Sequence, residues 1–202
     1  MSVATTRYTE EEYFQIELAS ELKHEYVNGE IIEMVGGSLR HDRINGNLFR
    51  MLGDQFDVPG FHVIYGSVRI RVPAPLNYFY PDAAVVRGTP ECLPNKPPTV
   101  VNPTVVFEIL SPSTERFNRG EKLRYYQQID SLAECVLISQ ETTEVERITR
   151  TTAGEWVHDR FTNSQDIVRL ESLVWGMPVS GIYRKVDFSE PGDDGQSGDE
   201  LG

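Results

Sequence analysis

Two continuous apolar runs constrain the fold of this chain more strongly than any other feature of its sequence. They are TVVFEIL (104–110) and CVLIS (135–139), and neither shows the polar–apolar alternation of a half-exposed strand. Such runs are typical of strands that are buried on both faces of a sheet. The segment between them, RGEKLRYYQQI (119–129), indicates a helix. The three elements therefore predict a right-handed βαβ crossover within an α/β domain.

The N-terminal segment carries a helix signal and a turn signal. Thr9 followed by Glu12 forms a capping-box pattern, which predicts a helix from this point to about Leu22. An Asn-Gly dipeptide then separates two apolar-bearing runs in HEYVNGEIIEMV (24–35), and this dipeptide is the strongest short signal for a β-hairpin. The chain is therefore expected to begin with a helix and a hairpin.

The rest of the chain mixes one further helix with strand-like patterns. Ser38 can cap a helix that reaches about Phe56, because apolar residues recur on one helical face. The later segments are strands at FHVIY (61–65), SVRIRV (67–72) and YPDAAVV (80–86), a Pro-rich loop (90–103), a hairpin (144–161), and a closing strand with short helical turns (166–186). This pattern predicts a mixed central β-sheet flanked by helices, in one domain covering residues 1–186.

The formal net charge of −12 argues at first against a nucleic-acid partner, which usually leaves a basic footprint. The charge is unevenly distributed, however, because residues 187–202 hold six acidic residues and no Lys or Arg. The other 25 acidic residues stand against 19 basic ones, which leaves −6 on residues 1–186. We expect residues 187–202 to be a disordered acidic tail. The acidic total therefore does not exclude nucleic acid.

Several chemistries have no basis in this sequence. The four His residues show no i, i+4 pairing and the two Cys residues form no C-x-x-C pair, so we expect neither a zinc site nor a disulfide framework. P-loop, G-x-G-x-x-G and G-x-S-x-G patterns are absent, which removes nucleotide-dependent enzymes and serine hydrolases. No apolar stretch reaches membrane-span length and the N-terminus lacks signal-peptide order, so we expect a cytoplasmic protein with no membrane partner.

Two carboxylates stand where charge is costly. Asp82 follows Pro81 at the start of a predicted strand, and Glu108 interrupts an otherwise apolar strand. A buried carboxylate is unfavourable unless it is paired or bound to a metal. If the two strands adjoin, both side chains offer hard oxygen ligands to Mg²⁺ or Mn²⁺. Lys122, on the next helix, could return to the same end of the sheet, and the three groups suit phosphodiester hydrolysis by metal-activated water.

The order of these motifs resembles that of a known family. The strings YPDAAVV, VVFEILSPST, RGEKLRYYQQI and SLAECVLIS, preceded by the N-terminal helix, HEYVNGEII and His41, are similar to the Uma-two (Uma2) family. Its members are described as candidate restriction endonucleases within the PD-(D/E)XK nuclease superfamily. The likeness covers nearly all of residues 1–186. It implies a restriction-endonuclease-like core and a Mg²⁺- or Mn²⁺-dependent endonuclease that cleaves DNA.

The resemblance also assigns roles to the acidic residues and the lysine. It places Asp82 and Glu108 at the two metal-ligand positions. The superfamily's usual lysine, two residues after the second acid, is replaced here by Leu110. In the Uma2 family the lysine has migrated to the following helix, and Lys122 matches that position. We expect Lys122 to position or deprotonate the nucleophile.

Further residues gain expected roles in the same way. Glu25 resembles an extra N-terminal carboxylate, which orients Lys122 or serves a second metal, and His41 matches a position expected to contact a phosphate or a metal-bound water. The family commonly has Asp where this chain has Asn118, and this lost charge predicts lower activity than in relatives.

Local charge gives the DNA interpretation modest support. Segments 40–50 and 113–126 each carry a surplus of two positive charges. Arg119 is therefore expected to contact phosphate, and Arg69, which alternates with Arg71 on one strand face, is expected to add a phosphate contact. With so few cations, we expect binding that is weak and strongly salt-dependent. A homodimer would suit cleavage of both strands. No sequence-reading module is visible, so the target sequence, and DNA against RNA, stay open.

Simpler interpretations stand beside these. Glu25 could be a surface charge of the hairpin, His41 an exposed helix residue, and Lys122 a solvated cation near a helix start. The alternative function is a catalytically decayed nuclease fold that acts in DNA binding or protein assembly. A third interpretation is a structural or regulatory protein whose buried acids pair with Arg69 or Arg71.

Overall fold

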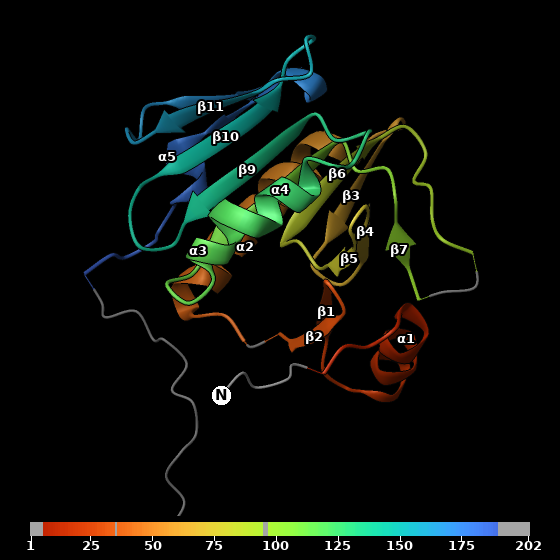
Figure 1. The fold of residues 1–202 in the computed structure, drawn as a ribbon. Coiled ribbons are helices and arrows are strands. Elements are labelled where there is room, and N and C mark those ends of the chain that lie inside the picture. The colour runs from red at the N-terminus through yellow and green to blue at the C-terminus, as the bar shows by residue number, and fades with distance from the viewer. Residues whose placement is uncertain (1–5, 35, 95–96, 190–202) are drawn as a thin grey trace, which may run out of the picture.

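A six-stranded mixed sheet is the centre of the fold (Figure 1). The structure, a computed structural model, describes residues 6–34, 36–94 and 97–189. The sheet has the order β11-β10-β9-β8-β6-β3, in which β8 and β9 are parallel and the other neighbours are antiparallel. The strands are β3 (Phe61–Tyr65), β6 (Ala83–Arg87), β8 (Val105–Leu110), β9 (Glu134–Ser139), β10 (Val145–Arg150) and β11 (Trp156–Phe161).

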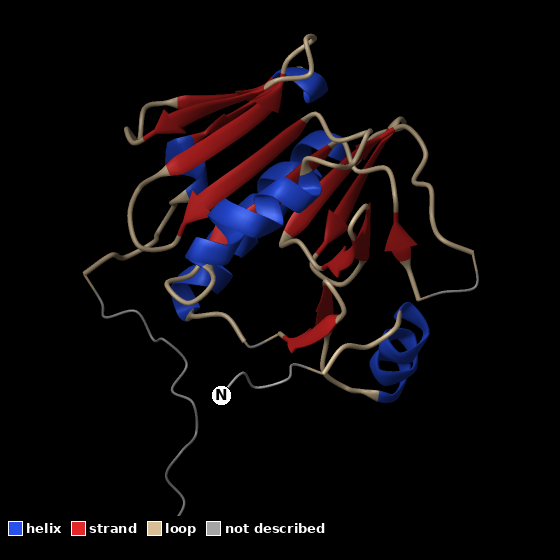
Figure 2. Cartoon of the chain, viewed as in Figure 1, coloured by secondary structure: helices blue, strands red, loops and turns tan. Residues whose placement is uncertain are grey.

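The predicted βαβ unit is present at the middle of this sheet. Every residue of β8 and β9 is buried, as the two continuous apolar runs predict. The connection contains α3 (Glu115–Phe117), a π-helical stretch (Asn118–Lys122) and α4 (Leu123–Tyr126). Figures 1 and 2 show α4 in front of the sheet and α2 behind it. The central strands are therefore covered on both faces.

The long helix α2 (Leu39–Phe56) covers the second face. Ser38 caps it, and the Ser38 hydroxyl accepts a hydrogen bond from the backbone N–H of His41. Its apolar side chains pack against Val105, Phe107 and Ile109 of β8. Because side chains alternate along a strand, the other residues of β8, including Glu108, face α4. The two-sided core thus aims Glu108 at the π-helical connection.

A second sheet carries the N-terminal elements. The expected capping box and hairpin are both present: Thr9 and Glu12 bond reciprocally, and Asn28 and Gly29 have φ angles of 51° and 89°. The sheet has the order β2-β1-β5-β4-β7, and α1 packs beside it. The elements are α1 (Glu10–Ala19), β1 (His24–Val27), β2 (Glu30–Glu33), β4 (Arg69–Pro73), β5 (Leu76–Phe79) and β7 (Thr99–Val100).

The C-terminal elements close the domain against α2. They are β12 (Ile167–Leu170), a short 3₁₀ turn (Glu171–Leu173), β13 (Trp175–Pro178) and α5 (Val179–Ile182). Phe188 still packs on the core, with its ring tilted against that of Tyr183, so contacts continue slightly beyond the expected boundary at residue 186. Residues 190–202, which hold most of the expected disordered tail, lie outside the described residues.

The structure departs from the sequence-based elements in three places. β7 is a short strand inside the segment expected to be a Pro-rich loop, and β5 is a short strand between two predicted strands, where none was expected. Pairing with neighbouring strands stabilises both despite the surrounding prolines. β13 adds a second closing strand. The connecting helix begins at Glu115, four residues before the predicted start, so Asn118 lies inside it.

Candidate active site

Asp82 and Glu108 lie side by side, as expected if their strands adjoin. β6 pairs with β8 in a register that places Ala83 opposite Phe107, so Asp82, one residue earlier, stands opposite Glu108. The Oδ2 atom of Asp82 also accepts a hydrogen bond of 2.6 Å from the backbone N–H of Ile109. This bond ties the Asp82 carboxylate to the strand that carries Glu108.

Asp82 and Glu108, with the side chains that contact them, form what we call the acidic centre. Glu108 is its most deeply buried carboxylate. Its Oε1 atom contacts Lys122 Nζ at 2.8 Å and accepts a hydrogen bond of 2.6 Å from the Tyr126 hydroxyl. Within the described part of the chain, no hydrogen bond reaches Oε2. Burial, reinforced by the charge of Asp82 and opposed by that of Lys122, raises the pKa of Glu108 to about 7. One oxygen of Glu108 is thus fixed by two donors and the other is left for a ligand.

Lys122 lies in the π-helical stretch, between two carboxylates. Its Nζ atom contacts Glu108 at 2.8 Å and Glu25 at 2.9 Å, and its side chain is only 5% exposed. π-Helical turns are rare and often occur at functional sites. Burial alone would lower the pKa of Lys122, but the charges of Glu108 and Glu25 outweigh it and raise the pKa. The amine is therefore held as an ammonium.

Glu25 brings the second sheet into contact with the first. It lies on β1 and its Oε1 atom accepts hydrogen bonds from Lys122 and, at 3.2 Å, from the backbone N–H of Tyr80. Tyr80 is two residues before Asp82. The interpretation of Glu25 as an exposed hairpin charge is wrong, because the residue is buried.

His41 is at the more open end of the centre. It occupies the first turn of α2, and its Nε2 atom is 3.2 Å from Oδ1 of Asp82. Burial lowers the pKa of His41, but the hydrogen bond and charge of Asp82, with help from Glu108, produce a net rise. Gly37 makes room for the ring, because a Cβ atom there would lie 2.8 Å from Nδ1. His41 is not simply an exposed helix residue.

The carboxylate oxygens of this centre suit a hard cation that takes only one or two ligands from the protein. No group of three or more His, Cys, Asp and Glu residues that could hold a metal occurs in residues 6–34, 36–94 and 97–189. Mg²⁺ commonly binds through one or two carboxylates and keeps several waters. Glu108 Oε2 and the Asp82 carboxylate, whose side chain is 16% exposed, offer such a pair. The residues present therefore fit Mg²⁺ or Mn²⁺.

Arg69 is not brought to this centre. It is fully buried, and its guanidinium lies within 6 Å of the ring centroids of Tyr13, Phe14, Tyr78 and Tyr80. It also donates to the Tyr13 hydroxyl and to the carbonyl of Pro97. This enclosure leaves no face for phosphate, so Arg69 as a phosphate contact is not supported. The buried acids pair with Lys122 and His41, and neither Arg69 nor Arg71 appears among the ion pairs of the described residues.

Arg119 pairs with carboxylates outside the acidic centre. It pairs with Glu115 at 2.6 Å, with Glu144 at 3.2 Å and also with Glu146. Three carboxylates already neutralise its charge, which makes it a poor phosphate contact. Asn118 is buried and its amide is 3.5 Å from the Thr114 hydroxyl.

The structure adds Tyr126 to the centre, a residue that the sequence did not assign to it. Tyr126 is buried in the core, and its hydroxyl donates a hydrogen bond to Glu108. Spacing of four residues could have identified Tyr126 as a neighbour of Lys122.

The sheet, its covering helices and the acidic centre define a restriction-endonuclease-like domain. A solved structure described as "a putative nuclease belonging to DUF820" from Anabaena variabilis matches with a TM-score of 0.66. It shares 15% sequence identity, and the match covers 81% of this chain and 91% of that one. At this identity the match shows the fold alone.

The chain belongs to the Uma2 family, described as "Putative restriction endonuclease", whose model matches residues 10–180. Two relatives come from Synechocystis sp. strain PCC 6803 and are called uncharacterized proteins. One, slr1290, is 30% identical over 88% of this chain and 92% of its own length. The other, sll1609, is 33% identical over 78% of this chain and 89% of its own length.

In the described residues, no helix is long and apolar enough to cross a membrane.

Proposed function

We propose that this protein is a Mg²⁺- or Mn²⁺-dependent endonuclease that hydrolyses phosphodiester bonds in DNA. The observation that carries the proposal is the convergence of Asp82, Glu108, Lys122 and Glu25 from four separate elements in one largely buried cluster. Buried charges are unfavourable, and ionisable groups gathered in this way are more common at functional sites than in structural cores. Membership of the Uma2 family supports the same reaction class.

Each residue has a role that follows from its contacts. Asp82 and Glu108 would hold the metal, which supplies charge neutralisation at the phosphate and activation of a water. Ile109 fixes Asp82 through its backbone N–H, and Tyr126 and Lys122 fix one oxygen of Glu108. The Asp82 and Glu108 carboxylates are thereby oriented before substrate arrives.

Lys122 acts through its charge in this proposal. A lysine whose pKa is raised is a poor general base, so deprotonation of the nucleophile, one of the two roles considered for it, is disfavoured. Lys122 is therefore a positioning residue that balances the carboxylates. His41, beside the exposed edge of Asp82, is the better placed group to meet a phosphate or the leaving oxygen.

The alternative is a nuclease fold that binds DNA or a protein without cleaving. The direct pairing of Lys122 with Glu108 and of His41 with Asp82 favours it, since these pairs satisfy one another without metal. A homodimer with two centres, in the cytoplasm, would suit the cleaving form.

Cleavage of supercoiled plasmid in Mg²⁺, Mn²⁺, Ca²⁺ or EDTA tests the proposal, with an RNA transcript as a parallel substrate. Mg²⁺ and Mn²⁺ should support cleavage and Ca²⁺ only binding, because the larger ion organises an in-line attack poorly. Glu108→Gln and Asp82→Asn should lower the rate by about 10³-fold or more.

Glu134→Gln is the matched control. Glu134 is a fully buried carboxylate on neighbouring β9 that accepts hydrogen bonds from the backbone of Glu171 and Ser172 and from no residue of the cluster. Its folded fraction should cut DNA at the wild-type rate. Metal-dependent binding without any cleavage by the wild type would favour the non-cleaving alternative.

A further inference from the structure

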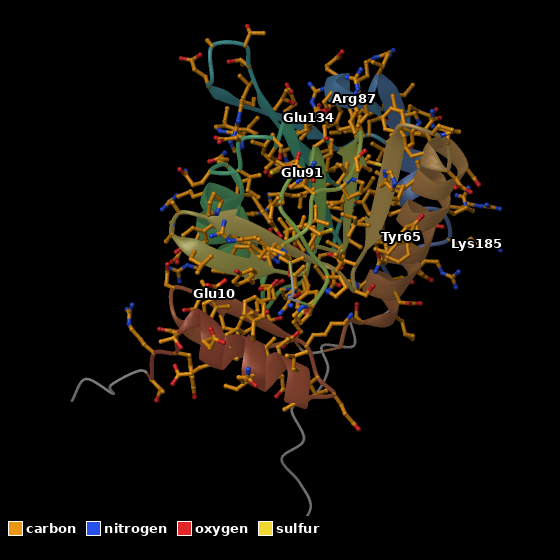
Figure 3. All side chains as sticks on the ribbon, turned by 90° about the vertical axis from the view of Figure 1, so that its right-hand side faces the viewer. Glu10, Tyr65, Arg87, Glu91, Glu134 and Lys185 are labelled. Carbon is orange, nitrogen blue, oxygen red and sulfur yellow. The ribbon has the colours of Figure 1, made fainter. Side chains whose placement is uncertain are left out.

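A hollow of about 400 Å³ lies between α2 and the segment that follows α5. Four cationic side chains line it, Arg43 and Arg50 from α2 and Arg184 and Lys185 from the later segment, against one carboxylate, Asp42. Figure 3 shows Lys185 beside α2 at the edge of the molecule. In a chain of net charge −12, this concentration of positive charge is unusual.

The hollow is separate from the acidic centre. His41 and Arg50 are nine residues apart on α2, and at about 100° per residue they project from opposite sides of the helix. A group bound in the hollow therefore does not contact Asp82 or Glu108.

The cations of the hollow are largely unpaired. Arg43, Arg184 and Lys185 form no ion pair with any described residue, and Arg50 has only a 3.7 Å contact with the exposed Asp54. Other arginines differ in this respect: Arg40, Arg119, Arg147 and Arg160 each pair with a carboxylate, so the hollow is distinguished by gathering several unpaired cations in one place. Unneutralised charge gathered in a concave surface attracts anions.

Gly46 gives a second, independent indication. It lies in the interior of α2 and lines the hollow, where a glycine costs about 1 kcal/mol relative to alanine. A Cβ atom at this position would meet nothing within 4 Å, so packing inside the protein does not require a glycine. Its absence of a side chain keeps the hollow open instead.

The segment after α5, which forms one side of the hollow, is held in place by a buried side-chain amide. The Asn47 side chain donates to the carbonyls of Ile182 and Arg184, at 2.9 and 2.8 Å. These bonds fix the backbone that presents Arg184 and Lys185 toward α2. This side of the hollow is therefore organised before any ligand binds.

We propose that this hollow binds a phosphate-ester group, apart from the phosphate that would be cleaved at Asp82 and Glu108. Guanidinium groups suit phosphate oxygens through paired N–H donors. The phosphate belongs either to a nucleic-acid backbone, in which case the inference rests on the proposed function, or to a free nucleotide.

Fluorescence anisotropy with a labelled DNA duplex in EDTA tests how much the cationic side chains of the hollow contribute to binding. The double variant Arg43→Gln/Arg184→Gln should bind about tenfold more weakly than the wild type. Its plot of log affinity against log salt should be shallower by about 1 for each cation that contacts a phosphate. The matched control Arg87→Gln/Arg169→Gln removes the same charge from exposed positions elsewhere and should bind as the wild type does.

Gly46→Leu tests the hollow without changing charge. Leucine fills the space and is a better helix former, so the variant should melt a few degrees higher yet bind more weakly. Displacement of the duplex by a mononucleotide or by inorganic phosphate would identify the free-nucleotide source, and its failure would identify the backbone.

The outcomes separate this inference from the proposed function. Hollow-dependent binding by a wild type that never cleaves DNA would retain the inference and overturn the endonuclease. Cleavage with equal binding by both double variants and by Gly46→Leu would overturn the inference alone. Absence of any binding of DNA, nucleotide or phosphate would overturn it as well.

Discussion

Two buried cations in this protein are accommodated in opposite ways. Arg69 is enclosed by the rings of α1 and the second sheet, with a hydroxyl and a carbonyl as its acceptors. Lys122 instead contacts two carboxylates, Glu25 and Glu108. Both cations are almost completely removed from water, yet only Lys122 is coupled to groups that can change protonation or bind a metal.

The difference shows how to distinguish structural from functional buried charge. An arginine among aromatic rings is stabilised by cation–π contacts and leaves no unpaired anion if it is removed. A lysine between carboxylates is bound to a site whose charges depend on one another. Removing each cation should therefore have different consequences for stability, pH dependence and activity.

Lys122→Met should give the largest effect on stability. It leaves Glu25 and Glu108 buried without a cation, which typically costs about 3–5 kcal/mol at neutral pH. We expect cleavage to fall by about 100-fold or more, the scale of one electrostatic group. Urea unfolding and single-turnover cleavage measure the two effects, and the destabilisation should shrink at acidic pH as the carboxylates protonate. Wild-type cleavage by this variant would show that Lys122 is only structural.

The pH dependence of stability isolates Glu108. Its pKa is raised to about 7 in the folded protein from 4.5, so the folded state binds a proton more tightly than the unfolded chain. This group therefore contributes stability at low pH that is lost as pH rises from about 4.5 to 7. In EDTA, Glu108→Gln should flatten that decline. An unchanged slope would mean that Glu108 titrates normally.

Arg69→Met should have a smaller effect that does not depend on pH. It removes cation–π contacts and two hydrogen bonds, at a cost of about 1–2 kcal/mol, and leaves no buried anion without a partner. Cleavage per folded molecule should stay at the wild-type level. Loss of activity beyond the loss of folded protein would place Arg69 in the functional machinery after all.

Tyr126→Phe should give the smallest effect. Loss of its hydrogen bond to Glu108 should cost about 1 kcal/mol and lower cleavage only a few-fold. It should also move the pH profile of cleavage slightly upward, because the Tyr126 hydroxyl favours the ionised form of Glu108. Tyr13→Phe, which loses a hydroxyl bonded to Arg69, is the matched control and should leave the profile unmoved.

The strong local and periodic signals made much of the fold predictable. The capping box at Thr9, the Asn28-Gly29 turn and the apolar runs of β8 and β9 depend on neighbouring residues, so they can be recognised in the sequence. β5 and β7 could not, because they are stabilised by pairing with distant strands. No pattern in the sequence predicts the π-helical stretch either.

The candidate site was predictable in composition but not in its internal pairing. The cost of a carboxylate inside an apolar strand identified Glu108, the position of the following helix identified Lys122, and family resemblance identified Glu25 and His41. The sequence could not show that Arg69 is enclosed by rings from α1 and the second sheet, or that Arg119 faces three carboxylates, because those contacts form only in the folded chain. Charge content alone predicted both as phosphate contacts.

A crystal soaked in Mn²⁺ tests the central claim most directly. Anomalous scattering should locate an ion bound by oxygens of Asp82 and Glu108 at about 2.1 Å, as expected for a small, hard, octahedral cation, and the ion should be absent from Glu108→Gln. An ion found only elsewhere, with Lys122 still paired to Glu108 and His41 to Asp82, would contradict the assignment of this cluster as a metal-dependent active site.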